Sequence, residues 1–398
     1  MKTLCRVWAA LFLLLLWLPL IEQQCHVFPA VRLYGVERPG RPAQFTWRGW
    51  WTGDFQRDFE RRLARRIGLR GYLVKTFNEF RYTLFGETHA RGGTQIVIGR
   101  DGWLYDRNQV QRYGRPARST PEQRSRIVAD LRRLQDALAA RGIAFCVILA
   151  PTKPTLYPEF VLPELLPPPK TRGPGEYEQI LPLLRVAGVH TVDGMELLAR
   201  RKQEQPHPLF PRTGTHWNYL AAGYVVEELT VELRRQSGRD FPVIRPVAVT
   251  VDRTPEGTDN DLGQLLNIWR TEAIAGPQVH PSFAREGGGE AHRPNILFIG
   301  DSFVHTLTHV LDRMEYYRAR DTFYYFRRRF TYPGGGDEPL DGSRFDWRRE
   351  LLERDAVVIE ICEHWLPNIG FGFVASALAF LDGDTAAELR AEGTPDDD

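Results

Sequence analysis

A serine that could act as a nucleophile follows an apolar run in the stretch NILFIGDSFVHTLTHVL. The run ends at Gly300, Asp301 and Ser302, and a helical pattern follows. A glycine allows a tight turn where a buried strand stops, and free N–H groups at the start of a helix can stabilise an oxyanion. We therefore predict that Ser302 is a catalytic nucleophile, with Gly300 and Asp301 at the oxyanion site. The alternative is that Asp301 or Ser302 only caps the helix.

A serine hydroxyl needs a base, and the best candidate is His216 in FPRTGTHWNYLAAGYVVEEL, where a polar turn precedes a long amphipathic helix. His305 and His309 lie on the helix after Ser302, where a side chain leans along its own helix, so they are interpreted as structural. The neighbours of the proposed base that are predicted to contact the substrate or the oxyanion are Thr215, Trp217 and Asn218.

The elements that must position these residues alternate between strands and helices. The buried apolar runs IAFCVILAP, VHTVD, NILFIG and AVVIEIC are separated by helical patterns such as TPEQRSRIVADLRRLQDALAARG, in which Thr120 and Gln123 form a capping box. This order predicts a three-layer α/β domain with a mostly parallel sheet, whose ligands bind at the carboxyl ends of the strands. Ser302 is expected at that edge.

Three further segments are candidates for flanking the site. Lys153 and Tyr157, in PTKPTLYPE, follow a strand end and are predicted to contact substrate, although a proline-set turn explains the pattern equally. Aromatic and arginine residues alternate in YYRARDTFYYFRRRFTY, which suits either sugar stacking or a half-buried strand. Residues 252–294 are expected to form a long irregular insertion that either borders the site or is a disordered surface loop.

The N-terminus is typical of an export element. Lys2 and Arg6 precede an uncharged apolar run over residues 7 to 21, and no small-residue cleavage signal follows it. An uncleaved membrane anchor is preferred over a cleaved signal peptide or a buried core helix, which puts the rest of the chain outside the cytoplasm. The predicted domains are the anchor (1–21), a tether (22–48), a helical extension (49–92), the catalytic domain (93–370) and a C-terminal tail (371–398).

Composition excludes some partners. Lysine and arginine number 52 against 50 acidic residues, and a net charge of +2 provides no field for binding nucleic acid. The four cysteines have neither metal-ligand nor disulfide-framework spacing. Neither a metal nor a cofactor is expected.

Several motifs together resemble a known family. GTHWN before a helix, GDSF after it, VIGRDGWLY upstream and APTKPTLYPE between them resemble the alginate O-acetyltransferase family (AlgJ/AlgX-like) of SGNH-hydrolase-like proteins, over about residues 55 to 367. The resemblance implies an SGNH-like fold, Ser302 as nucleophile and His216 as base. It also implies a periplasmic domain on an inner-membrane anchor, a polysaccharide acceptor and a membrane-bound O-acyltransferase that supplies acetyl.

The chain departs from that family at one position. The family carries an aspartate two residues before the histidine, where this sequence has Gly214. Asp261 is our first choice for a replacement, because DLGQLL is similar to a family segment upstream of the serine motif. Without a replacement, a backbone carbonyl or water must orient His216. The other acidic candidates are Asp259, Asp193 and Glu363.

The sequence thus predicts an O-acetyltransferase that works through an acetyl-serine. Two alternatives remain at this stage. A secreted carbohydrate esterase would use the same serine and histidine with water as acceptor. A polysaccharide-binding scaffold with a decayed site would explain Gly214.

Overall fold

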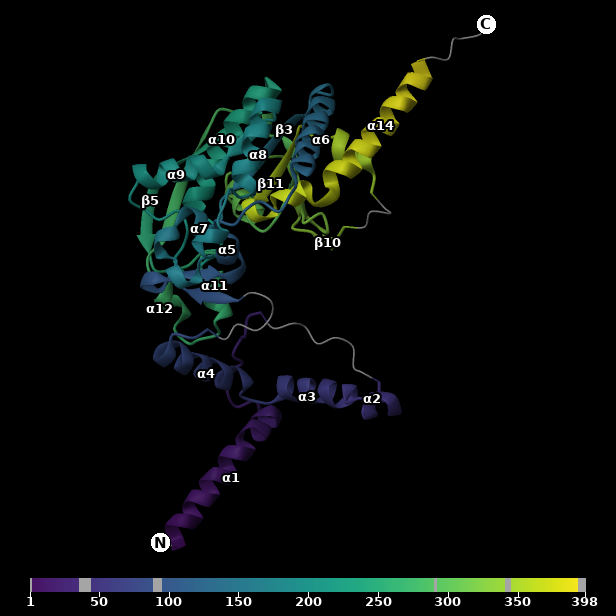
Figure 1. Ribbon diagram of the computed structural model, residues 1–398. Helices are drawn as coiled ribbons and strands as arrows, with labels where there is room; N and C mark the ends of the chain where they lie inside the picture. Colours follow the sequence, from purple (N-terminus) through teal and green to yellow (C-terminus); the bar gives the residue numbers. More distant parts are fainter. Residues whose placement is uncertain (1, 36–43, 89–94, 290–291, 341–344, 393–398) are drawn as a thin grey trace.

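The computed structural model describes residues 2–35, 44–88, 95–289, 292–340 and 345–392 (Figure 1). Its strands are β1 (Ile96–Ile98), β2 (Leu104–Asp106), β3 (Ala144–Ala150), β4 (Thr191–Asp193), β5 (Val243–Asp252), β6 (Gln278–Glu286), β7 (Asn295–Gly300), β8 (Ala319–Tyr324), β9 (Arg328–Tyr332), β10 (Asp337–Pro339) and β11 (Ala356–Cys362). Its longer helices are α1 (Lys2–Cys25), α3 (Asp54–Arg66), α4 (Arg70–Phe85), α6 (Pro121–Ala139), α8 (Glu176–Ala187), α9 (Gly194–Glu204), α10 (Tyr219–Ser237), α13 (Val304–Arg313) and α14 (Phe373–Glu392). The shorter helices include α2 (Trp47–Trp51), α5 (Arg107–Arg112), α7 (Lys153–Leu156), α11 (Asp261–Leu265) and α12 (Thr271–Ala275).

A seven-stranded sheet forms the centre of the molecule, in the order β10-β9-β8-β7-β11-β3-β4. The pairs from β8 to β4 are parallel, whereas β9 and β10 add antiparallel strands at one edge. The prediction of a mostly parallel sheet is confirmed. The segment YYRARDTFYYFRRRFTY supplies β8 and β9, so its alternation is that of a partly buried strand pair.

Side chains of the central strands alternate between two apolar cores. In β3, Cys146 and Ile148 face the core that contains α10 and α13, while Phe145 and Val147 face the core that contains α6, α8 and α14. Both faces are covered, which is why β3 reads as a continuous apolar run. Figure 1 shows α6, α8 and α10 around β3 and β11. The predicted Thr120 capping box at the start of α6 is present.

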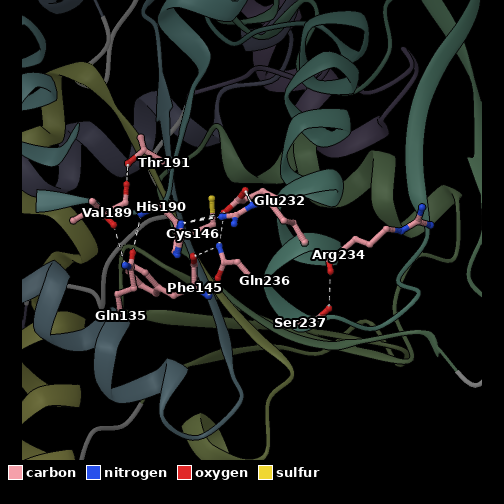
Figure 2. A network of polar contacts seen from close by, with 12 residues as sticks. Gln135, Phe145, Cys146, Val189, His190, Thr191, Glu232, Arg234, Gln236 and Ser237 are labelled. Carbon is pink, nitrogen blue, oxygen red and sulfur yellow. Dashed lines mark hydrogen bonds and ion pairs between the residues drawn. The ribbon is translucent and has the colours of Figure 1, made fainter. Parts of the chain in front are cut away.

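A polar network ties the amino end of β3 to the helices on both faces (Figure 2). Gln236 on α10 accepts a hydrogen bond from the Phe145 N–H at 2.9 Å and donates one to its carbonyl at 2.8 Å. Gln135 on α6 accepts from the His190 N–H at 2.7 Å. Amide side chains therefore hold the amino ends of β3 and β4, at the edge of the sheet opposite Ser302.

The segment between β5 and β6 differs from its prediction. β5 and β6 pair antiparallel along their length, and the short helices α11 and α12 lie between them. The expectation of an irregular insertion over residues 252–294 is therefore wrong for much of its length; residues 290 and 291 lie outside the described residues. Pro281 hid the strand from sequence analysis, because proline is rare inside strands.

The helical extension holds this segment against the sheet domain. The extension consists of the helices α2, α3 and α4. On α4 the buried Asn78 donates a hydrogen bond to the Leu266 carbonyl at 2.8 Å, directly after α11. The side chain of Asn267 also accepts from the Tyr34 N–H at 2.8 Å, so part of the predicted tether contacts the same loop.

The two terminal helices differ in their burial. Ala377 and Leu381, on the first half of α14, lie in the core of the sheet domain, so the predicted tail begins as a packed helix. The large apolar side chains of α1 are exposed, and Figure 1 shows this helix projecting from the body. Among the described residues, Glu363–Gly383 is long and apolar enough to span a membrane, but it is 44% buried in the protein. The two halves of α1, taken together, are also long and apolar enough to span one.

Candidate active site

Ser302, His216 and Asp261 form a hydrogen-bonded chain at the carboxyl edge of the sheet. The Ser302 Oγ lies 2.7 Å from His216 Nε2, and His216 Nδ1 lies 2.7 Å from Asp261 Oδ2. A carboxylate only accepts hydrogen bonds, so Nδ1 carries the proton and Nε2 is free to accept from the serine. This is the arrangement of nucleophile, base and orienting acid used in acyl transfer.

Asp261 is held in place independently of the histidine. Its Oδ1 accepts hydrogen bonds from the backbone N–H groups of Thr215, at 2.8 Å, and Leu262, at 2.6 Å. The contact that the replacement-acid hypothesis requires is therefore present. The other acidic candidates lie elsewhere: Asp193 caps α9, and Glu363 accepts from the Thr152 N–H.

Gly214 cannot carry the family aspartate without a shift of the backbone. A Cβ atom at this position would lie 2.8 Å from the Thr258 carbonyl oxygen and 2.9 Å from that of Asp259. The loop that carries Asp261 thus passes through the space that a side chain at Gly214 would need. This close backbone approach explains the glycine at position 214.

The turn that presents Ser302 is built on a buried carboxylate. Asp301 accepts hydrogen bonds from the Phe303 N–H at 3.0 Å and the Cys362 N–H at 2.9 Å, which tie the turn to β11. A Cβ at Gly300 would lie 2.8 Å from an oxygen of the fully buried Glu360. Burial and the charge of Asp301 raise the pKa of Glu360 well above its usual range. Asp301 therefore shapes the turn, and its predicted place among the oxyanion groups is not supported by its side chain.

The HWN motif fixes the base onto the serine turn. Trp217 is fully buried, and its Nε1 donates to the Phe303 carbonyl at 3.2 Å. The ring of Phe303 packs edge-on against His216 with centroids 4.9 Å apart. Asn218 caps α10 by accepting from the Ala221 N–H at 3.0 Å. Trp217 and Asn218 are thus buried side chains that hold the histidine loop rather than faces open to a substrate, and Thr215 contributes its N–H to Asp261.

Lys153 is fully buried beneath the histidine loop, so the prediction that it contacts substrate is wrong. Its Nζ donates to the carbonyls of Leu104 at 2.7 Å, Arg212 at 2.9 Å and Gly214 at 2.9 Å. Burial lowers the pKa of Lys153 well below its usual range, while the charge of Asp261 opposes that effect. Because Nζ bonds to three backbone carbonyls, Lys153 is a positioning residue for the backbone before His216.

Tyr157 also holds the structure rather than facing substrate, contrary to its prediction. Its buried hydroxyl accepts from the Leu209 N–H at 2.8 Å, and its carbonyl accepts from the Tyr105 hydroxyl at 2.7 Å. Its ring packs on Trp103 with centroids 4.9 Å apart. The GWLY and PTLYPE motifs therefore form one support under the loop that leads to His216.

Tyr325 is a site residue that sequence analysis missed. It adopts a left-handed backbone conformation with φ 49°, and its N–H donates to the Gly300 carbonyl at 2.8 Å. Burial and the charge of Asp301 raise the pKa of Tyr325, and a hydrogen bond with Ser302 opposes this effect. An unfavourable φ next to a nucleophile is typical of functional positions. In the sequence, Tyr325 is only one of several aromatic residues in DTFYYFRRR, and nothing there distinguishes it from its neighbours.

The arrangement of Ser302, His216 and Asp261 supports acyl transfer. Within the described ranges, no group of three His, Cys, Asp or Glu side chains is placed to hold a metal ion. The nucleophile, the base and its acid come from the turn after β7, the loop before α10 and the start of α11.

Comparison with known proteins gives the family. Residues 96–323 match the model of the SGNH hydrolase-like domain of acetyltransferase AlgX. The chain therefore belongs to this AlgX family. Family membership confirms the predicted SGNH-like fold and the enzyme class, an acetyltransferase, and the matched range contains Ser302, His216 and Asp261.

Individual relatives of the AlgX-family chain are distant. It is 28% identical over 343 residues to the probable alginate O-acetylase AlgJ of Pseudomonas aeruginosa, covering 79% of each chain. Among solved structures it is similar to the O-acetyltransferase domain of Pseudomonas putida AlgJ, with 16% identity, a TM-score of 0.43, and coverage of 69% of this chain and 92% of that domain. Pseudomonas aeruginosa AlgX gives 17% identity and a TM-score of 0.41, covering 71% of this chain and 66% of AlgX.

Proposed function

We propose that the protein transfers acetyl groups to hydroxyls of an extracytoplasmic polysaccharide through an acetyl-serine at Ser302. The observation that carries this proposal is the chain Ser302–His216–Asp261, with both contacts at 2.7 Å. Family membership and the AlgJ relatives, whose names refer to alginate O-acetylation, support a polysaccharide as the acceptor.

The reaction has two half-reactions at one site. Ser302 Oγ attacks the acetyl carbonyl while His216 Nε2 takes its proton, and the leaving group receives that proton as the donor bond breaks. An acceptor hydroxyl then gives its proton to His216 and attacks the acetyl-serine, which restores the Ser302 hydroxyl. Asp261 holds the imidazole in one tautomer and stabilises the imidazolium formed in each step. The Tyr325 hydroxyl, beside Ser302, orients the nucleophile.

A location at the membrane belongs to the same proposal. The exposed apolar surface of α1 and the positive residues Lys2 and Arg6 support an inner-membrane anchor with the catalytic domain in the periplasm. A membrane-bound O-acyltransferase that passes acetyl across the membrane is the partner that this arrangement suits. The anchor keeps Ser302 within reach of such a donor.

The esterase alternative uses the same three residues, and the choice of acceptor separates the two functions. We expect an activated acetyl ester with a suitable oligosaccharide to give acetylated sugar faster than free acetate, because transfer requires the acceptor to outcompete water. Mass spectrometry of the sugar, with acetate release measured in parallel, follows both products. If every candidate glycan leaves hydrolysis unchanged and unacetylated sugar is recovered, the esterase function replaces transfer.

The third function considered, a polysaccharide-binding scaffold with a decayed site, is no longer supported by the glycine at position 214. Gly214 suggested a decayed site, but Asp261 provides the carboxylate contact to His216. An intact hydrogen-bonded triad is not expected in a protein that only binds polysaccharide.

A further inference from the structure

The helical extension carries an apolar face that the sheet domain does not cover. On α4, four large apolar side chains at helical spacing are each between 51% and 62% exposed, namely Leu73, Phe77, Phe80 and Leu84. Residues three or four positions apart lie on one face of a helix, so these side chains form a continuous stripe. The buried Asn78 lies on the opposite face of α4 and bonds to the Leu266 carbonyl. The stripe therefore faces away from the catalytic domain.

Helices α2 and α3 continue the apolar face with aromatic residues. The side chains of Trp47 and Trp51 on α2 are 80% and 91% exposed. On α3, Phe55 and Phe59 stack with ring centroids 6.4 Å apart, and Leu63, one turn further on, is 46% exposed. Exposed apolar patches of this extent mark contact with a membrane or with another protein. Tryptophan is enriched at the boundary between membrane and water, which favours the membrane.

The charge of the segment that forms α2 and α3 is positive. Residues 47–66 contain six arginines and three acidic residues. Arg48 and Arg61 are exposed, and Arg57 pairs with Asp54 at 2.6 Å. A helix with an apolar face, aromatic residues and arginines on its polar side is typical of segments that lie in the plane of a bilayer surface, where the cations meet anionic headgroups. Charge and exposure thus both favour a lipid surface as the partner.

The end of α1 adjoins this apolar face. Gly68, in the turn between α3 and α4, lies against the last turns of α1, because a Cβ atom there would lie 2.6 Å from the Gln23 nitrogen and 2.9 Å from the Glu22 Cβ. Figure 1 shows α2, α3 and α4 lying across that end of α1, between α1 and the sheet domain. A bilayer that contains α1 therefore has α2, α3 and α4 at its surface.

We propose that α2, α3 and α4 form an interfacial surface that lies flat on a bilayer of anionic lipids. The interfacial surface consists of the stripe on α4 together with Trp47, Trp51, Phe59 and Leu63. These side chains enter the boundary between headgroups and acyl chains, while the arginines of α2 and α3 contact the headgroups. The inference rests on the membrane location within the proposed function.

The interfacial surface fixes how the catalytic domain faces the bilayer. A single helix such as α1 leaves the domain free to rotate about its tether, whereas a second contact across α2, α3 and α4 removes that freedom. Asn78 joins α4 to the loop directly after α11, and α11 carries Asp261. The helix that contacts the bilayer is therefore bonded to the segment that completes the triad.

A membrane protein is the alternative occupant of the interfacial surface. Interfaces between proteins are depleted of charged residues at their core. Here exposed arginines such as Arg48 and Arg61 border the apolar side chains, which extend over three helices across the end of α1 (Figure 1). This pattern favours lipid over protein.

Spin labels on single cysteines measure the depth of each helix in a bilayer. The full chain, with the exposed Cys5 and Cys25 replaced by serine, is reconstituted in nanodiscs of phosphatidylcholine and phosphatidylglycerol that contain no other protein. The label is attached in Leu84→Cys on α4, in Leu13→Cys on α1 and in Val186→Cys on α8, where the native valine is 89% exposed and lies outside the interfacial surface. Accessibility to a water-soluble nickel complex falls as a label enters the bilayer.

We expect the nickel complex to reach the label of Leu84→Cys about threefold less readily than that of Val186→Cys, because position 84 lies at the acyl-chain boundary. Nanodiscs of phosphatidylcholine alone should narrow this difference, since the arginines lose their anionic partners. Equal accessibility of the two labels in the anionic nanodiscs overturns the inference and leaves a protein as the occupant. A difference that is unchanged without anionic lipid overturns the choice of anionic headgroups.

Two charge variants test the interfacial surface without moving the label. Leu73→Glu/Phe80→Glu places two carboxylates in the stripe, whereas Val186→Glu/Val247→Glu adds the same charge at exposed positions outside it. The first variant should return the Leu84→Cys label to full nickel accessibility, and the second should leave it protected. Protection retained in both variants overturns the inference. Thermal unfolding in detergent checks that each protein folds.

The label in Leu13→Cys separates this inference from the proposed anchor. A protected position 13 with an accessible position 84 contradicts the interfacial surface and leaves the anchor intact. An accessible position 13 with a protected position 84 contradicts the anchor and supports the interfacial surface. Acetyl transfer enters neither measurement, so the catalytic part of the proposed function is tested separately.

Discussion

At the scale of residues, the site depends on the carboxylate of Asp261. Asp261 lies 45 positions after His216 in the chain, yet it contacts the imidazole at 2.7 Å. Gly214, at the position of the family aspartate, leaves room for the loop that brings Asp261 into place. The base needs an acceptor on Nδ1 and not a particular sequence motif, so a carboxylate from a distant segment can orient it.

Asp261→Asn should lower kcat by about 10²–10⁴-fold with little change in KM, because an amide can hold the wrong tautomer of His216 and cannot stabilise the imidazolium. Steady-state hydrolysis of an activated acetyl ester measures both constants. Glu272→Gln, an exposed change nearby in the chain, is the control. Retention of the parent kcat by Asp261→Asn would remove this residue from the mechanism.

Lys153→Met should lower the free energy of unfolding by about 1–3 kcal/mol, because the carbonyls of Leu104, Arg212 and Gly214 each lose a hydrogen bond from Nζ. It should also lower kcat, since the Gly214 carbonyl lies two residues before His216. Denaturant unfolding and ester hydrolysis measure the two effects. Lys202→Met, at a side chain that is 28% exposed and ion-paired with Glu159, should cost less than about 1 kcal/mol. Equal effects of the two variants would contradict the positioning role.

At the scale of elements, the segment between β5 and β6 is the part of the fold that matters most for the site. It carries Asp261 on α11, and α4 fixes the loop after α11 through Asn78. The Gly263 N–H donates to the Thr213 carbonyl at 3.0 Å, which joins α11 to the histidine loop. A hairpin and two short helices thus align the acid with a base from a different connection.

The buried Asp259 in this segment should make stability depend on pH. Burial raises the pKa of Asp259 to about 7, so the folded state keeps a proton that the unfolded chain loses near pH 4. The contribution of Asp259 to the free energy of unfolding is therefore fully present below about pH 4 and is lost as the pH rises through about 7. Asp259→Asn should raise the free energy of unfolding by about 2–4 kcal/mol at pH 8 and change it little at pH 4. Thermal unfolding at both pH values measures this, and a gain of the same size at pH 4 would contradict it.

Much of the sheet could be predicted from the sequence, because buried parallel strands read as unbroken apolar runs and α6 carries explicit capping residues. Ser302 and His216 were found for the same reason: each lies in a short motif next to a predicted strand or helix. The support roles of Lys153 and Tyr157 could not be predicted, since whether a side chain turns into or out of a strand end depends on tertiary packing. Tyr325 was missed because a left-handed residue in an aromatic run has no periodic signal.

At the scale of the whole molecule, a catalytic edge and an apolar N-terminal helix lie on one chain. The central sheet presents Ser302 at its carboxyl edge, while the polar network around Gln236 holds the opposite edge (Figure 2). The exposed apolar side chains of α1 require a cover that the described protein does not provide.

Full-length protein should be found in the membrane fraction, and deletion of residues 2–25 should release it into the soluble fraction. The catalytic residues lie outside α1, so hydrolysis of an activated acetyl ester should be unchanged. Fractionation with N-terminal sequencing measures the first point. A soluble mature protein that starts downstream of residue 21 would contradict the anchor.

The measurement that tests the central claim most directly is the mass of the Ser302 peptide after brief reaction with an activated acetyl ester. The account predicts one acetyl group on Ser302, its loss when the acceptor oligosaccharide is added, and acetylated sugar as the product. Ser302→Ala should fold, as judged by an unchanged thermal unfolding transition, and should neither carry the acetyl group nor transfer it. A folded Ser302→Ala protein that acetylates the oligosaccharide at the parent rate would contradict the account.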